Sequence, residues 1–125
     1  KEGLEYAILT SEISKATFGV KPSAYKNYKG LNRENLRDHM NNRELIFTML
    51  GEEQTRLEAI KDDAQGFEEN KYSAVKGGEA AGDALDAFEK RTGDRVKSPD
   101  NFLDQIKAAK KKKKLERKAA KNKNE

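Results

Sequence analysis

The sequence predicts an all-α protein: a small helical bundle of four to five helices with a basic C-terminal extension. Apolar residues recur at helical spacing in several segments, and no segment alternates apolar and polar residues as a half-buried strand does. Helix-capping residues and glycines separate these segments. Only 34% of the residues are hydrophobic and 38% are charged. Each helix can therefore offer one apolar stripe to a single thin core.

Residues 3–18 are predicted to form the first helix, because their apolar residues fall at helical spacing and Gly19 is placed to end it. One short helical turn is expected next, with Pro22 at its first position. A second short helix is expected at residues 32–40, with Asn32 as its N-cap.

The predicted helix at residues 42–64 has a well-specified start. Asn41 is placed as the N-cap, and Glu44 can reach back to the free N–H of that cap in a capping box. Gly51 inside this helix costs roughly 1 kcal/mol relative to alanine, and it marks either a close packing point or a kink. Gly66 is predicted to end the helix.

The next predicted helix, at residues 69–91, has a face of small residues. Small side chains at helical spacing let another backbone approach closely, so this face predicts packing against a partner helix. The adjacent Gly77 and Gly78 weaken the helix, and the alternative is a break at that point. Thr92 and Gly93 are placed to close the segment. The predicted packing face consists of Ala74, Gly78, Ala81, Gly82 and Leu85.

Ser98 as N-cap and Pro99 at the first helical position predict the start of a last helix. Phe102, Leu103 and Ile106 can dock this helix on the rest of the bundle. The predicted core of the whole bundle consists of Leu4, Ile8, Ile13, Leu36, Leu45, Met49, Leu57, Ile60, Leu85, Phe88, Phe102 and Ile106.

Charge divides the chain into two parts. Residues 107–125 carry ten Lys or Arg and two Glu, a net charge of +8, whereas residues 1–106 carry 16 basic and 20 acidic residues, a net charge of −4. We therefore predict a helical module at residues 1–106 and a Lys-rich tail at residues 107–125. Leu115 is the only large apolar residue of the tail, so the tail is either a solvated helix or disordered.

Several classes of function find no support in the composition. The chain has no cysteine, which rules out disulfides and cysteine-based metal sites and favours a reducing, cytoplasmic location. No apolar run approaches 18 residues, so we expect no membrane span. His39 is the only histidine, so we expect no metal site and interpret it as a cap or surface residue. The chain lacks a nucleophile elbow, and its neighbouring carboxylates are typical of solvated helix surfaces, so we expect neither an enzyme nor a cofactor.

Two basic segments are candidate nucleic-acid-binding surfaces. The tail can condense onto phosphates by releasing counterions, without reading bases, and the alternative is a tail that only increases solubility. The second segment combines lysines with tyrosines on which bases could stack, and the alternative is that these tyrosines lie half-buried at the edge of the core. The candidates are Lys110, Lys111, Lys112, Lys113, Lys114, Arg117 and Lys118 in the tail, and Lys21, Tyr25, Lys26, Tyr28 and Lys29 in the second segment.

Three blocks of sequence, in order, carry a resemblance to a known family. The run KEGLEYAILTSEISKATFG at residues 1–19 is similar to the segment that follows the N-terminal domain in Bro-N-type phage antirepressors. The runs YKGLNRENLRDHM at 28–40 and ELIFTMLGE at 44–52 resemble the central block of that family. DAQGFEENKYSAVKGGEAAGDALDAFEKRTGDRV at 63–96 resembles its closing block. Proteins called DNA-damage-inducible protein D share a related, more distant pattern. The resemblance covers roughly residues 1–105.

The resemblance implies a regulatory role. Full-length members carry an upstream Bro-N domain thought to bind DNA, and they act by antagonising a repressor or a recombination protein. This chain lacks that domain and begins at Lys1, so we expect it to be the C-terminal module of a longer protein. No catalytic residue can be carried over. We therefore expect a non-catalytic module that contacts a protein partner, with direct nucleic-acid binding as the alternative. The thin core also favours a homo-oligomer, formed through a face that the monomer leaves uncovered.

Overall fold

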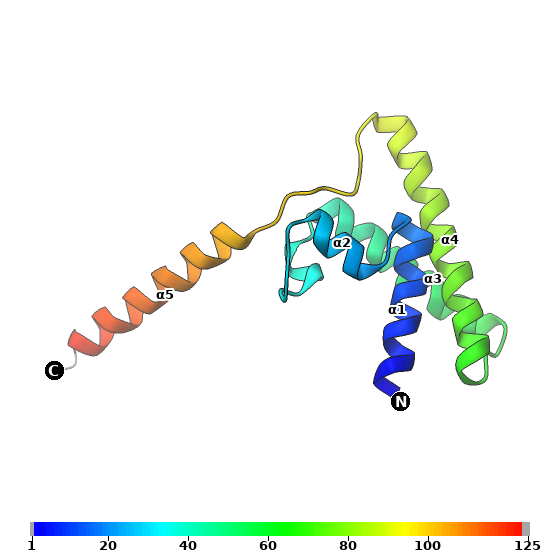
Figure 1. Cartoon of the computed structure of the whole chain (residues 1–125), viewed down its shortest axis with the longest axis horizontal. Helices are drawn as coiled ribbons and strands as arrows, with labels where there is room; N and C mark the ends of the chain where they lie inside the picture. Colours follow the sequence, from blue (N-terminus) through cyan, green and yellow to red (C-terminus); the bar gives the residue numbers. More distant parts are fainter. Residues whose placement is uncertain (1, 124–125) are drawn as a thin grey trace.

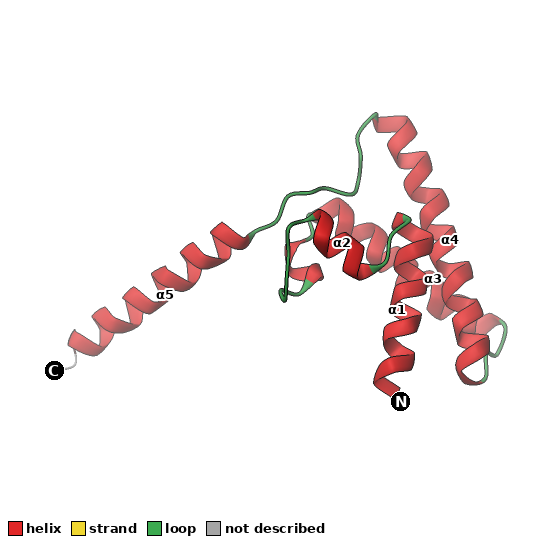
Figure 2. Cartoon of the chain, viewed as in Figure 1, coloured by secondary structure: helices red, strands yellow, loops and turns green. Residues whose placement is uncertain are grey.

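The computed structural model describes residues 2–123, with side chains for residues 2–122, and that range contains only helices and loops (Figure 2). The predicted all-α class and its basic C-terminal extension are confirmed. In chain order the elements are α1 (Glu2–Phe18), α2 (Pro22–Tyr28), the 3-10 helix η1 (Leu36–His39), α3 (Asn42–Lys61), α4 (Gly66–Thr92) and α5 (Leu103–Lys123). Residues 124 and 125 of the predicted tail lie outside the described range.

The long helix α4 is the element on which the body is assembled (Figure 1). Both α1 and α3 pack along it, and glycines at the contacts let the backbones approach closely. A Cβ added at Gly77 would lie 2.6 Å from the Cα of Thr55 in α3. One added at Gly78 would lie 2.6 Å from the Cβ of Ala16 in α1. Because α4 runs unbroken through both glycines, tight packing explains them and a helix break does not.

The helix α3 ends earlier than predicted, at Lys61. Asp63 adopts a left-handed conformation with φ of 48° and turns the chain, so α4 can already begin at Gly66. The prediction that Gly66 ends a helix is therefore wrong, because this glycine starts the next one. Gly93 ends α4 as predicted, with a φ of 78° that glycine adopts without strain.

The capping box predicted at the start of α3 is confirmed. The Asn41 side chain accepts the N–H of Glu44 at 2.9 Å, and the Glu44 carboxylate accepts the N–H of Asn41 at 3.0 Å. The preceding short helix, η1, is shorter than predicted. Its N-cap is Asn35, whose side chain accepts the N–H of Arg37 at 2.9 Å, so the assignment of this role to Asn32 is wrong.

The last helix, α5, begins at Leu103, four residues after the predicted start at Pro99. Ser98 does not cap it, because the Ser98 hydroxyl accepts the N–H of Asp100 at 3.1 Å in a local turn. The side-chain oxygen of Asn101 accepts the N–H of Leu103 at 3.0 Å instead. Contacts between this segment and the body, described below, keep it outside any helix.

The core lies on a different face of α3 from the one predicted. Four predicted core side chains, Leu4, Met49, Leu57 and Ile60, are 46–67% exposed, so this part of the core prediction is wrong. The helix turns Phe47 and Gly51 inward instead, because glycine permits close approach to α1 and α4. Of the other predicted members, Leu85 is buried, and the half-buried ones are Ile8, Ile13, Leu36, Leu45, Phe88, Phe102 and Ile106. The buried hydrophobic residues are Tyr25, Leu31, Met40, Phe47, Ala74, Ala81, Leu85 and Val96.

Candidate nucleic-acid interface

The helix α5 presents a dense positive charge away from the body (Figure 1). Every side chain from residue 107 to residue 122 is exposed. This stretch carries nine Lys or Arg residues and a single acidic residue, Glu116. The structure therefore places the tail residues that are predicted to bind nucleic acid on one solvent-exposed helix. These are residues 110–114, 117 and 118.

Two opposing effects act on the stability of α5. Lys, Arg, Ala and Leu are good helix formers, which favours the helix. Lys110 and Lys114 repel each other at i,i+4 spacing, as do Lys114 and Lys118, and each such pair costs a few tenths of a kcal/mol. A polyanion lying along α5 relieves this repulsion, so phosphate binding and helix formation should reinforce each other.

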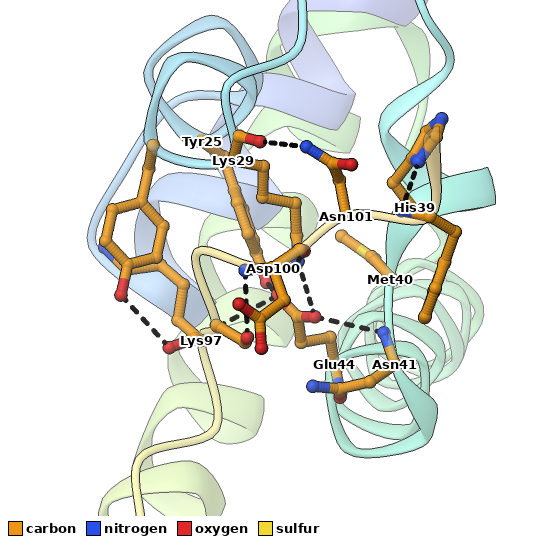
Figure 3. Close-up of polar contacts among 12 residues, drawn as sticks. Tyr25, Lys29, His39, Met40, Asn41, Glu44, Lys97, Asp100 and Asn101 are labelled. Atoms are coloured by element: carbon orange, nitrogen blue, oxygen red, sulfur yellow. Dashed lines mark hydrogen bonds and ion pairs between the residues drawn. The ribbon is translucent and has the colours of Figure 1, made fainter. Parts of the chain in front are cut away.

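The start of α5 is attached to the body by a buried polar cluster, which we call the α5 anchor. Its buried members are Tyr25, Lys29 and Glu44, which Figure 3 shows beside Asp100 and Asn101. Ser98 and Asn101 are half-buried and Asp100 is exposed, and these three complete the cluster. At its centre the Lys29 Nζ lies 2.8 Å from the Glu44 Oε1, and neither side chain is exposed to solvent. The same ammonium group donates to the carbonyl of Asp100 at 2.8 Å. A lysine that directly follows α2 thus links the capping glutamate of α3 to the segment that precedes α5.

The buried Glu44 carboxylate is well supplied with donors. It accepts the Tyr25 hydroxyl, the Ser98 N–H at 3.2 Å and the Asn41 N–H at 3.0 Å, in addition to the Lys29 ammonium. Burial raises the pKa of the Tyr25 hydroxyl well above its ordinary value, and the hydrogen bond to Glu44 raises it further. Tyr25 therefore stays protonated and acts as a donor to the carboxylate.

Two further contacts hold the two residues that directly precede α5. The Asn101 side-chain amide donates to the carbonyl of Lys29 at 2.7 Å. The ring nitrogen Nδ1 of His39 accepts the N–H of Phe102 at 3.0 Å, and the two rings stack with an interplanar angle of 17°. His39 is only 3% exposed, so of its two interpretations, cap or surface residue, the second is wrong. It serves instead as an acceptor for a free N–H at the start of α5.

The second predicted basic segment contains both buried and exposed residues. Tyr25 and Lys29 are 0% and 1% exposed, so the prediction that they contact nucleic acid is wrong: their polar atoms belong to the α5 anchor. Lys21 is exposed and Lys26 is half-buried. Tyr28 is 44% exposed, and the ammonium of Lys97 lies 4.7 Å from the centre of its ring. The exposed Lys21 and Tyr28 and the half-buried Lys26 remain as candidates. The half-buried Lys97 is a further candidate that sequence reasoning missed.

The small-residue face of α4 is occupied by the chain itself. Ala74, Gly78, Ala81 and Leu85 are buried and Gly82 is half-buried. A Cβ at Gly82 would overlap the carbonyl oxygen of Ala16, and the Thr17 hydroxyl donates to the Gly78 carbonyl at 3.3 Å. The predicted close approach is therefore made by α1 and α3, so this face is closed to a second protein.

Between residues 2 and 122, no three His, Asp or Glu side chains gather where they could hold a metal ion. None of the helices in the described range is long and apolar enough to cross a membrane. Comparison with models of known families, with curated proteins and with solved structures found no match to this chain.

Proposed function

We propose that this chain is a non-catalytic regulatory module of a cytoplasmic phage antirepressor or DNA-damage-response protein, and that it associates with duplex nucleic acid through α5. The regulatory part rests on the resemblance of residues 1–105. The nucleic-acid part rests on one observation: α5 is exposed on all sides and carries nine basic side chains against one acidic side chain between residues 107 and 122.

Electrostatics gives this helix its affinity and limits its specificity. Each lysine that neutralises a phosphate releases condensed counterions, which favours binding in dilute salt. Flexible ammonium groups arranged around a helix carry no code for base edges, so binding is sequence-independent. α5 has no aromatic residue on which unpaired bases could stack, which favours duplex over single-stranded nucleic acid.

The structure removes one argument for a protein partner. It drew on the small-residue face of α4, and that face is buried against α1 and α3. A repressor or recombination protein would have to contact the module elsewhere.

The nucleic-acid proposal predicts a steep salt dependence that depends on α5. Duplex binding by the full chain is measured between about 50 and 200 mM salt, for the wild type and for a five-lysine variant. Removing one lysine–phosphate interaction should reduce the log–log slope by about 0.9, so the variant slope should be smaller by roughly 2–4. Glutamine keeps the helix propensity close to that of lysine. The five-lysine variant combines Lys110→Gln, Lys111→Gln, Lys112→Gln, Lys113→Gln and Lys114→Gln.

A charge-matched control separates α5 from net charge. Five exposed basic residues of the body are replaced by glutamine, which changes the net charge by the same amount and should leave the slope near the wild-type value. Equal slopes for the two variants, or a wild-type slope near zero, would refute the proposal. The control variant combines Arg33→Gln, Lys61→Gln, Lys90→Gln, Arg91→Gln and Arg95→Gln.

A further inference from the structure

The outward face of α3 carries large apolar side chains that the described part of the chain leaves uncovered. Ten large hydrophobic side chains in the described range are exposed, and five of them lie on this one helix. Their exposed fractions run from 38% to 63%. The inward face of the same helix is already packed against α1 and α4 through Phe47 and Gly51. We call the exposed set the α3 stripe: Ile46, Met49, Leu50, Leu57 and Ile60.

The spacing of the α3 stripe is that of a helix-pairing surface. Ile46, Leu50, Glu53, Leu57 and Ile60 follow one another at intervals of four, three, four and three residues. This alternation places side chains along one line of an α-helix and is the spacing by which helices pair in coiled coils. A second helix is therefore the occupant that fits the stripe.

The stripe is also nearly the same when read backwards. Ile46 and Ile60 each lie seven residues from Glu53, and Met49 and Leu57 each lie four residues from it. If a second copy of α3 lies antiparallel across a two-fold axis beside Glu53, isoleucine faces isoleucine and methionine faces leucine. Leu50 then faces Arg56, and the two Glu53 side chains face each other at the axis. A two-fold interface uses the same surface on both subunits, so it requires this kind of self-complementary order.

Charges at the centre of the stripe fit the same arrangement. Glu53 and Arg56 form an ion pair within the chain, and their side chains are 54% and 59% exposed. This ion pair lowers the pKa of the Glu53 carboxyl, mainly through the hydrogen bond from Arg56. At the proposed axis the two Glu53 carboxylates face each other, and each keeps the Arg56 of its own chain as its counter-charge. Two positive and two negative charges would then gather at the middle of an otherwise largely apolar contact.

We propose that a second copy of this chain docks on the α3 stripe, with the two α3 helices antiparallel about a two-fold axis beside Glu53. The dimer covers the exposed apolar surface that the thin core of one chain leaves in water. It also brings two copies of α5 into one particle.

Sedimentation of the full chain without nucleic acid tests the dimer independently of the proposed function. At about 0.1 mM protein, a micromolar dimer should be mostly associated. Leu57→Glu should give a monomer with an unchanged circular dichroism spectrum, because it places a charge in the apolar contact. The matched control Leu115→Glu makes the same change on α5, where leucine is 59% exposed, and should leave the dimer intact. A monomeric wild type, as expected if the stripe instead binds another protein, would overturn the proposal, and so would a dimer that survives Leu57→Glu.

Two more variants test the antiparallel geometry. Arg56→Glu leaves only negative charge around the axis and should raise the dimer Kd about tenfold or more, and adding Glu53→Arg should restore most of the affinity. Because the chain has no cysteine, Glu53→Cys provides a single thiol at the proposed axis, which a short thiol cross-linker should join to its copy. Arg33→Cys, exposed on the loop before η1, should not cross-link. Cross-linking efficiency that is equal at the two positions would exclude this arrangement.

Discussion

Lys29→Met is expected to lower the free energy of unfolding by about 3–5 kcal/mol, because it leaves the buried Glu44 carboxylate without its counter-charge. Both side chains of this pair are inaccessible to solvent, and their charged atoms lie 2.8 Å apart. The variant also leaves the carbonyl of Asp100 without the donor that Lys29 supplies. Domains are typically stable by about 5–15 kcal/mol, so the loss is a large part of the total. Urea denaturation followed by circular dichroism measures it.

A double variant distinguishes the ion pair from simple loss of packing. Lys29→Met combined with Glu44→Leu removes both charges, so it should be clearly more stable than Lys29→Met alone. Amide hydrogen exchange supplies a second measurement, since Lys29→Met should speed exchange at Ser98 and Phe102, whose N–H groups are held at the start of α5. Stability of Lys29→Met within about 1 kcal/mol of the wild type would show that the buried pair does not contribute as described.

Gly77→Ala is expected to destabilise the fold by about 2 kcal/mol or more, although alanine is the better helix former. The added Cβ would overlap the backbone nitrogen and side-chain oxygen of Thr55 and lie 2.6 Å from its Cα. A flexible side chain could rotate away, but the backbone of α3 can only move as a whole. The helices α3 and α4 would have to separate, and that opens the contact on which the body depends. Thermal and urea denaturation both report the change.

Gly3→Ala is the matched control for this substitution. It makes the same chemical change in a helix, at a position in α1 where no atom lies within 4 Å of the added Cβ. Helix propensity alone then decides the outcome, and stability should rise by up to about 1 kcal/mol. If Gly77→Ala behaved like Gly3→Ala, the close approach of α3 and α4 would be disproved.

Several ends of the helices could be predicted from local signals in the sequence, whereas the face by which α3 packs could not. Gly19, Gly93 and the capping box of Asn41 and Glu44 act within a few residues of one another, so they can be recognised without the fold. The face that α3 buries was predicted wrongly. Its larger aliphatic side chains, such as Ile60, form one clear stripe, but a glycine on another face allows the closer approach.

The basic charge of the tail could be predicted from composition, whereas its attachment to the body could not. The run of five lysines at residues 110–114 can be recognised from the sequence alone. The α5 anchor joins Lys29 to Glu44, 15 residues away, and to Asp100, 71 residues away. Nothing local marks Lys29 as buried, because lysine is ordinarily exposed and a lysine beside tyrosines is equally typical of a nucleic-acid surface. Only the three-dimensional arrangement assigns it to the interior.

The α5 anchor determines how α5 responds to force. A loosely tethered tail would follow a bound duplex without disturbing the rest of the chain. Here the carbonyl of Asp100 and the N–H of Ser98 are held by the same buried ion pair that stabilises the start of α3. If α5 binds a duplex as proposed, a bend or rotation of α5 would therefore strain the interior of the body directly.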